Sequence, residues 1–468
     1  MNPNTAPYVH FEQTQAREFA QFANRQIEKQ GIPVDFPPDV EFALYEAAPC
    51  ANRKDLRWLD CLTIDCSSTK DMDDAVSLSP IDGGFVLGVH IADVAAYVQP
   101  GSRIDEIASD RGTSIYLPDR TIPMLPSELS ANLCSLNPGE ERNAVTVLIA
   151  LDDDAKVTGY DISKSVVVSR IKGTYDEVNR ILSRTATQDD LSKYSGFETV
   201  LHEMNWLAEK LLEDRIAAGA KMFDNCEPSI SIAGDRIDIS YKPRGRAESI
   251  IEEFMVLANR IVAEYFDLNG LPTIFRSQST NQTLAKYDAS QSGHANLALE
   301  RYVHFTSPIR RIADLKVHQI LSLFLDGCNP ALITESLNAD LTATSELATK
   351  RSRRADGVQK SCSKFCCRLY FKDHEGEVFD GEVVGFGKNN RPIILISKIH
   401  VRVYGPIRQG LKIGQKLSFC VNVNDKKNET TAYRVRPLRR TADVNGRPKR
   451  HRSRTPNRNR PFIQNNAA

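Results

Sequence analysis

The spacing of hydrophobic residues divides the 468-residue chain into regions of different character. Near its start, apolar residues recur at helical spacing over 11–29, and a second short helix is expected over 39–47, just after two prolines. From residue 54 to about 370, strand-like runs alternate with long amphipathic stretches, which predicts an α+β fold. Strands are predicted over 86–98, 144–151 and 166–170, and helices over 174–183, 194–217, 247–269, 312–325 and 333–370.

The pattern changes in the last hundred residues. Short alternating segments at 379–387, 392–396, 401–404 and 416–423 are separated by Gly and Asn, which is typical of a small five-stranded barrel. Residues 438–468 are rich in Arg, Pro and Asn and have almost no apolar content. They are predicted to form a disordered basic tail.

Composition narrows the class of protein. Hydrophobic residues make up 41% of the chain, an ordinary value for a soluble protein, and no apolar run approaches the length of a membrane span. The ten cysteines show no CxxC pair, which favours free thiols in a reducing cytosol. We therefore expect a soluble, cytoplasmic, monomeric protein. The net charge is zero, but the end of the chain is basic, and this asymmetry is a hint of nucleic-acid binding.

Four carboxylates, Asp65, Asp71, Asp73 and Asp74, lie within ten residues between strand-like runs. Like charges this close repel one another unless a cation lies among them. Oxygen ligands with no histidine or thiolate partner suit Mg²⁺ or Mn²⁺, and such ions most often serve phosphate chemistry. An acidic surface loop is the alternative, whereas an EF-hand would need a glycine and a closing glutamate that are absent. Because Asp73 and Asp74 would point to opposite faces of a strand, the backbone is expected to turn near Met72.

The segment 63–77 resembles the signature of the RNase II/RNase R family, the RNB exoribonucleases, in which an aspartate is followed six, eight and nine residues later by three more. The resemblance covers roughly residues 54–437, and further blocks follow in the family's order at 88–94, 111–126, 133–138, 251–259 and 304–311. It implies a short helical region at 1–53, an RNB catalytic domain at 54–372, an S1-like OB-fold RNA-binding barrel at 373–437 and the tail at 438–468. Because some fifty residues cannot hold the family's two N-terminal cold-shock barrels, we expect a short form that lacks them.

By the same resemblance, the chain is expected to be a Mg²⁺-dependent exoribonuclease that hydrolyses single-stranded RNA from the 3′ end and releases nucleoside 5′-monophosphates. Asp65, Asp71 and Asp74 would hold Mg²⁺, or Mn²⁺, and Asp73 would help to activate water. Arg310 would contact the scissile phosphate, to which a planar guanidinium is well suited, and an ion pair with an aspartate is the alternative.

Four further residues are expected to bind RNA. Tyr175 and Phe223 match family aromatics that stack on bases near the 3′ end, although either could be a core residue. Glu252 matches a glutamate at the terminal nucleotide, where a contact with the 2′-OH would favour RNA over DNA. Arg311 would assist Arg310 or serve the fold alone.

The chain departs from the family pattern at three places, and two of them, the short segment before Tyr287 and Gln359, favour a rival prediction. The segment between Arg276 and Tyr287 is short, Ile312 replaces a tyrosine, and Gln359 stands where the family usually has glutamate. The rival is a weakened or inactive RNA-binding or regulatory protein on a trimmed RNB scaffold. A phosphodiesterase for small nucleotides is a third reading, which the barrel argues against. Because all four aspartates and Arg310 remain, the sequence favours an active enzyme. Its expected partner is single-stranded RNA. No membrane role is expected, and the sequence indicates no protein partner.

Overall fold

The structure, a computed structural model, describes residues 14–40, 53–221, 228–280, 284–406, 410–424 and 429–437. Most of the helix predicted over 39–47, the predicted RNA contact Phe223 and the basic tail from residue 438 onward lie outside these ranges.

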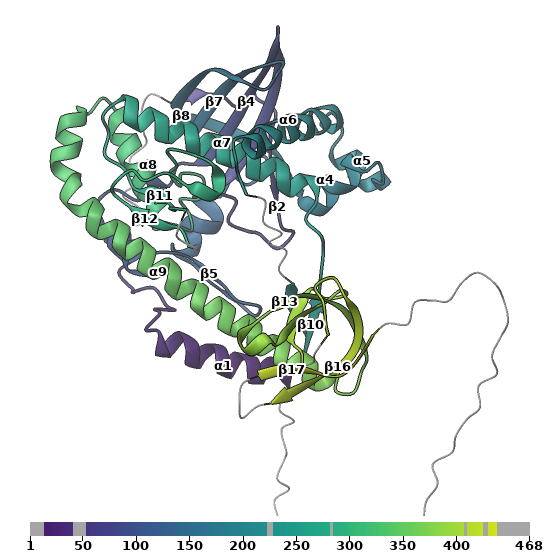
Figure 1. Cartoon of the computed structure of the whole chain (residues 1–468). Helices are drawn as coiled ribbons and strands as arrows, with labels where there is room; N and C mark the ends of the chain where they lie inside the picture. The colour runs from purple at the N-terminus through teal and green to yellow at the C-terminus, as the bar shows by residue number, and fades with distance from the viewer. Residues whose placement is uncertain are drawn as a thin grey trace, which may run out of the picture.

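A six-stranded sheet forms the centre of the larger body, in the order β1-β8-β2-β3-β4-β7 (Figure 1). Residues 157–168 of the long strand β8 pair with β7, and residues 169–174 pair with β2. Nearly every residue of β2 is buried, which explains its continuous apolar run. The strands are β1 (Lys54–Asp55), β2 (Cys61–Asp65), β3 (Asp74–Ile81), β4 (Gly84–Ala92), β7 (Glu141–Asp152) and β8 (Val157–Thr174).

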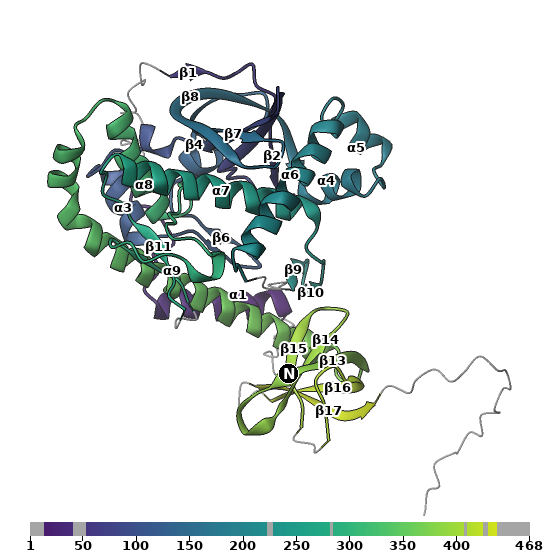
Figure 2. The ribbon, with the colours of Figure 1, turned by 45° about the horizontal axis from the view of Figure 1, so that its top comes forward.

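Helices pack against this sheet and enclose a large apolar core (Figure 2). Their boundaries follow local signals: α4 begins where Thr174 and Glu177 form a reciprocal capping box. The helices are α3 (Arg103–Arg111), α4 (Tyr175–Leu182), α5 (Gln188–Lys193), α6 (Glu198–Ala217), α7 (Arg246–Leu268) and α8 (Ile312–Leu325). Shorter elements are β5 (Ile115–Tyr116), β6 (Thr121–Ile122), β9 (Ser229–Ala233), β10 (Arg236–Ser240), β11 (Phe275–Ser277), β12 (Lys286–Asp288), η2 (Val94–Ala96), η3 (Glu128–Leu133) and η4 (Ala295–Leu297).

The 44-residue helix α9 (Pro330–Asp373) runs along the body and ends at the C-terminal barrel (Figure 1). At 1.5 Å per residue it is about 66 Å long. Helix α1 (Gln15–Lys29) lies against its second half, where Phe22 and Phe365 stack with ring centroids 4.1 Å apart. This contact belongs to a second apolar core, which also contains the inner residues of the barrel.

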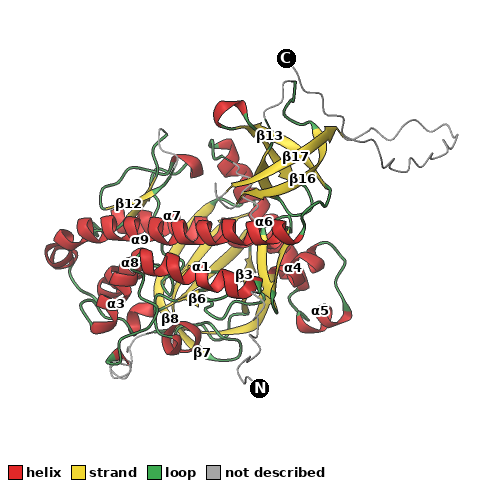
Figure 3. Ribbon diagram, turned by 90° about the horizontal axis from the view of Figure 1, so that it is seen from below, coloured by secondary structure: helices red, strands yellow, loops and turns green. Residues whose placement is uncertain are grey.

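The predicted five-stranded barrel is confirmed (Figure 3). It closes in the order β13-β14-β15-β17-β16, and β14 and β15 match the predicted segments residue for residue. Tyr241, just after β10, stacks on His400 of the barrel, with ring centroids 4.1 Å apart. The elements of the barrel are β13 (Phe379–Phe386), η5 (Lys388–Asn390), β14 (Pro392–Ile396), β15 (Val401–Tyr404), β16 (Lys416–Asn424) and β17 (Glu429–Pro437). Among the helices of the described ranges, none is long and apolar enough to cross a membrane.

Candidate active site

The four aspartates lie at one end of neighbouring strands. Strand β2 ends at Asp65, the antiparallel strand β3 begins at Asp74, and the loop between them carries Asp71 and Asp73. The predicted turn near Met72 is confirmed, because this residue lies in that loop and is buried. The N–H of Met72 donates to Ser135 Oγ at 3.0 Å, and that hydroxyl donates to the carbonyl of Lys70 at 2.9 Å. Ser135, which lies just after η3, therefore fixes the backbone of this loop.

Asp73 is the most enclosed of the four, with 3% of its surface exposed. Its Oδ1 accepts a hydrogen bond from the N–H of Ile309 at 2.8 Å, and its Oδ2 accepts one from Arg310 Nε at 3.1 Å. Burial raises the pKa of Asp73 to about 7, although the charge of Arg310 opposes that rise. Arg310 also donates to Ser307 Oγ at 2.8 Å, and its side chain keeps 40% of its surface exposed. The arginine is thus anchored on one edge and open to a ligand on the other.

Asp71 is engaged by a residue that sequence reasoning did not single out. The hydroxyl of Tyr116 donates to Asp71 Oδ2 at 2.9 Å, and burial together with that carboxylate raises the pKa of the phenol. The phenol therefore stays protonated and able to donate. The backbone N–H of Tyr116 donates to Gln359 Oε1 on α9 at 2.8 Å. The available signal was that Tyr116 is the aromatic residue inside the block at 111–126.

The site carries more negative charge than its own cations neutralise. Burial raises the pKa of Asp65 to about 6, Arg310 opposes the rise and Asp71 adds to it. Burial, followed by the charges of Asp65 and Asp73, raises the pKa of Asp74 well above its usual range. Within the described ranges, no three His, Cys, Asp or Glu side chains already converge as a metal site. The oxygen donors and the uncompensated charge nevertheless fit a hard divalent cation, because Asp71 keeps Oδ1 available while Oδ2 accepts from tyrosine.

The two neighbouring arginines have different surroundings. Arg311 forms a bidentate pair with Asp314, with Nε and Nη2 at 2.9 and 2.6 Å from the carboxylate oxygens. Asp314 is fully buried and also accepts from the N–H of Ser307 at 2.8 Å. This pair fixes the start of α8, so Arg311 supports the segment that presents Arg310. Its predicted RNA contact stays a prediction.

The remaining predicted RNA contacts divide between the site and helix α7. Tyr175 begins α4 directly after Thr174, which pairs with Asp65, and burial, followed by the charges of Asp74 and Asp65, raises the pKa of its phenol. Glu252 is partly exposed and pairs with Arg244 and, at 3.7 Å, with Arg215. Its neighbour Glu253 is 2% exposed and accepts two hydrogen bonds from Arg215, from Nη2 at 2.5 Å and from Nε at 2.7 Å. The structure therefore leaves Glu252 as the accessible carboxylate of the two.

Known proteins are similar to this chain in sequence. The family model for the RNB domain matches residues 53–284 and 280–327, which is more than half of the chain. The ribonuclease R of Thermotoga maritima is 34% identical over 395 residues, covering 72% of this chain and 55% of that protein. The chain spans about half the length of the curated relatives it matches.

Solved structures share the fold. RNase R of Mycoplasma genitalium, in complex with ribose-methylated single-stranded RNA, matches with a TM-score of 0.77 at 21% identity, covering 88% of this chain and 78% of that one. Yeast Ssd1, a pseudonuclease, matches with a TM-score of 0.60 at 18% identity, covering 83% and 53%. Because an RNase and a pseudonuclease both match, the fold does not decide activity. The family model and the identity to ribonuclease R show that this chain belongs to the RNB family.

Proposed function

We propose that the chain is a Mg²⁺-dependent exoribonuclease that degrades single-stranded RNA from the 3′ end and releases nucleoside 5′-monophosphates. The observation that carries the proposal is the pairing of Asp73 with a half-exposed Arg310 inside a group of four aspartates. One place thus offers oxygen ligands for a cation beside a guanidinium that can receive a phosphate. Membership of the RNB family supports the same reaction.

Each residue has a part in this proposal. Asp65, Asp71 and Asp74 would hold the ion, which when bound lowers the pKa of water and shields phosphate charge. Arg310 binds the scissile phosphate through the guanidinium N–H groups that Asp73 and Ser307 leave free. Asp73 orients that guanidinium and would help to activate water, and hydrolysis then breaks the bond between phosphorus and the 3′ oxygen. The water oxygen joins phosphorus, and a proton passes to the leaving 3′ oxygen.

Tyr175 and Glu252 would define the place of the terminal nucleotides. Tyr175 directly follows Thr174, which pairs with Asp65, so a base stacked on the ring of Tyr175 would lie close to the reacting phosphate. The accessible carboxylate of Glu252 could accept a hydrogen bond from a 2′-OH, which DNA lacks. A free single-stranded 3′ end is the substrate that uses both residues.

A 5′-labelled oligoribonucleotide incubated with Mg²⁺ tests the reaction, with EDTA as the control. We expect products that shorten from the 3′ end, release of nucleoside 5′-monophosphates and no reaction in EDTA. A circular RNA of the same sequence should stay intact, and its rapid cleavage would reveal an endonuclease. Titration calorimetry with Mg²⁺ and with Mn²⁺ tests the ion without relying on activity.

The second candidate is an RNA-binding protein without catalysis. The match to a pseudonuclease favours it, because this fold persists where hydrolysis does not. The presence of all four aspartates and Arg310 opposes it. Binding of the linear oligoribonucleotide without any shortening, in either metal, would establish this candidate and reject the first.

A further inference from the structure

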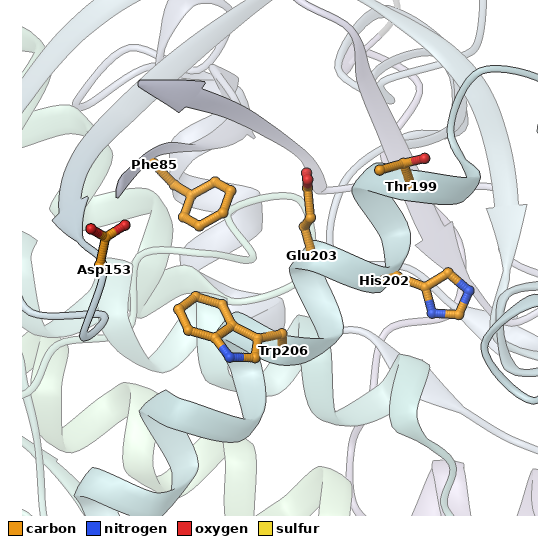
Figure 4. A pocket seen from close by; sticks show the side chains of 6 residues that line it. All are labelled: Phe85, Asp153, Thr199, His202, Glu203 and Trp206. Carbon is orange, nitrogen blue, oxygen red and sulfur yellow. The ribbon is translucent and has the colours of Figure 1, made fainter. Parts of the chain in front are cut away.

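A shallow, open hollow of about 420 Å³ lies on the body away from the aspartate loop. Figure 4 shows its lining: the rings of Phe85 and Trp206 face each other, and the carboxylates of Asp153 and Glu203 lie beside them. The two rings are 5.8 Å apart between centroids and tilted by 46°. His202 points away from the ring pair.

The hollow is separate from the proposed catalytic site because it lies at the other end of the same strands. Asp74 begins β3, whereas the turn that follows Ile81 brings the chain to Gly84 and Phe85. Seven residue steps of about 3.4 Å place these ends roughly 24 Å apart. Gly84 pairs with Asp152, so the turns of two hairpins meet at the hollow.

The chemistry of the hollow suits a cation beside an apolar group. Glu203 and Trp206 lie three residues apart on α6 and share one face of that helix. Among the described residues, Asp153 and Glu203 have no hydrogen-bonding or ion-pair partner for their side chains, and the nearby Lys156 is already paired with Asp214. An indole face attracts a guanidinium, and free carboxylates strengthen that attraction. A phosphate backbone would meet only negative charge here, which argues against RNA.

The chain itself contains a segment with this chemistry. Residues 438–468 carry nine Lys and Arg residues and one Asp. Because the whole chain has sixty residues of each sign, the first 437 residues carry eight more negative than positive charges. Near the end, Arg458 and Arg460 stand next to Pro461 and Phe462, which combines cations with an apolar anchor.

The length of the segment is sufficient. From Pro437, the last described residue, to Phe462 is 25 residues. An extended chain of that length reaches roughly 80 to 90 Å. A compact protein of this size is about 60 Å across, from a radius of gyration of roughly 23 Å. Every face of the body is therefore within reach, and a tethered segment binds at a high effective concentration.

We infer that residues 458–463 dock into the hollow of their own chain, with an arginine over the Trp206 ring and between the two carboxylates and with Phe462 against the ring pair. The inference is independent of the proposed catalysis. By this inference, the hollow beside Asp153 and Glu203 is a docking surface for the end of the basic C-terminal segment and not for RNA.

Tryptophan fluorescence tests the inference directly, because the chain has only two tryptophans and Trp58 is 69% exposed. In the full chain carrying Trp58→Phe, emission reports Trp206 alone. We expect Arg458→Ser, Arg460→Ser and Phe462→Ser together to move the emission to longer wavelength by several nanometres and to raise acrylamide quenching about threefold. Asp153→Asn with Glu203→Gln should produce the same changes.

The matched control is Glu346→Gln with Asp356→Asn, two exposed acids on α9, which should leave the emission unchanged. Equal emission and quenching in the parent and in the tail-substituted chain would overturn the inference. Changes that disappear on tenfold dilution of the protein would also overturn it, because docking would then occur between copies. Circular dichroism of every variant separates loss of docking from loss of fold.

Discussion

Asp73 and Arg310 bind each other and also take part in the backbone arrangement around them. The carbonyl of Arg310 accepts hydrogen bonds from Ser114 N–H at 3.0 Å and from the hydroxyl of Thr113 at 2.9 Å. The carbonyl of Asp73 accepts from the N–H of Ala92 at 2.8 Å. Both residues are therefore fixed by main-chain bonds that do not depend on their charges. A change of charge at Asp73 should alter chemistry more than structure.

We expect Asp73→Asn to reduce turnover by more than tenfold while RNA affinity stays near that of the parent. The amide keeps an oxygen for the Ile309 N–H but loses the charge that orients Arg310 and would help to activate water. A tenfold loss of turnover corresponds to about 1.4 kcal/mol of transition-state stabilisation. Single-turnover cleavage of a labelled oligoribonucleotide measures the rate, with Asp82→Asn on an exposed turn as control. Turnover above a tenth of the parent value would contradict the role given to Asp73.

At the scale of elements, α9 reaches the aspartate loop through one strand residue. Gln359 accepts from the backbone of Tyr116, and the hydroxyl of Tyr116 donates to Asp71. The structure thus gives Gln359 a use that needs an acceptor oxygen and no charge. Glutamine at this position retains that oxygen, so its lack of charge is weak support for an inactive protein.

Substitution of Gln359 separates the acceptor from the charge. We expect Gln359→Glu to keep kcat within about twofold, whereas Gln359→Leu should lower kcat roughly three- to tenfold, because an unmatched hydrogen bond costs about 1 kcal/mol. KM should change little in either variant, since the residue lies behind Tyr116. A Gln359→Leu enzyme with parental kcat would show that α9 does not position this tyrosine for catalysis.

Helix α7 carries two adjacent glutamates with opposite environments. Glu253→Ala should lower stability by roughly 3 kcal/mol, because the largely buried Arg215 then keeps only Glu252, 3.7 Å away, as a partner. Glu252→Ala removes a partly exposed ion pair and should change stability by less than about 1 kcal/mol. Thermal unfolding of both variants makes the comparison. Equal losses of stability would contradict the difference in environment between the two carboxylates.

Elements governed by local signals were predictable from sequence, and those governed by distant contacts were less so. Helix α8 begins and ends at its predicted residues, because its sequence is apolar along most of its length and is buried on most sides. The strand predicted over 86–98 stops at Ala92, since the side chain of Asp93 accepts from the N–H of Ala96 and starts a 3₁₀ turn. The grouping of the aspartates followed from their spacing. The part of Tyr116 did not, because 45 residues separate it from Asp71.

At the scale of the whole molecule, the seven Lys and Arg residues over 439–454, which precede the docking residues 458–463, are expected to add to RNA binding. Each phosphate neutralised on a single strand contributes about 0.7 to the slope of log K against log salt. Truncation after Leu438 should therefore weaken RNA binding at low salt and flatten that slope by a few units, while cleavage of a short, saturating oligonucleotide hardly changes. Equal slopes for the full and truncated chains would leave the segment without a part in RNA binding.

The contact between α1 and α9 has a consequence for synthesis on the ribosome. Phe22 stacks on Phe365, and Gln15 donates to the carbonyl of Leu369, so these two partners of the first described helix emerge 343 and 354 residues later. At roughly 5–20 residues per second, that delay is about 17 to 70 s. Until then, the apolar stripe of Phe19, Ala23 and Ile27 lacks the part of its native surroundings that α9 provides. A holding chaperone would therefore have a long-lived target in this helix of the nascent chain.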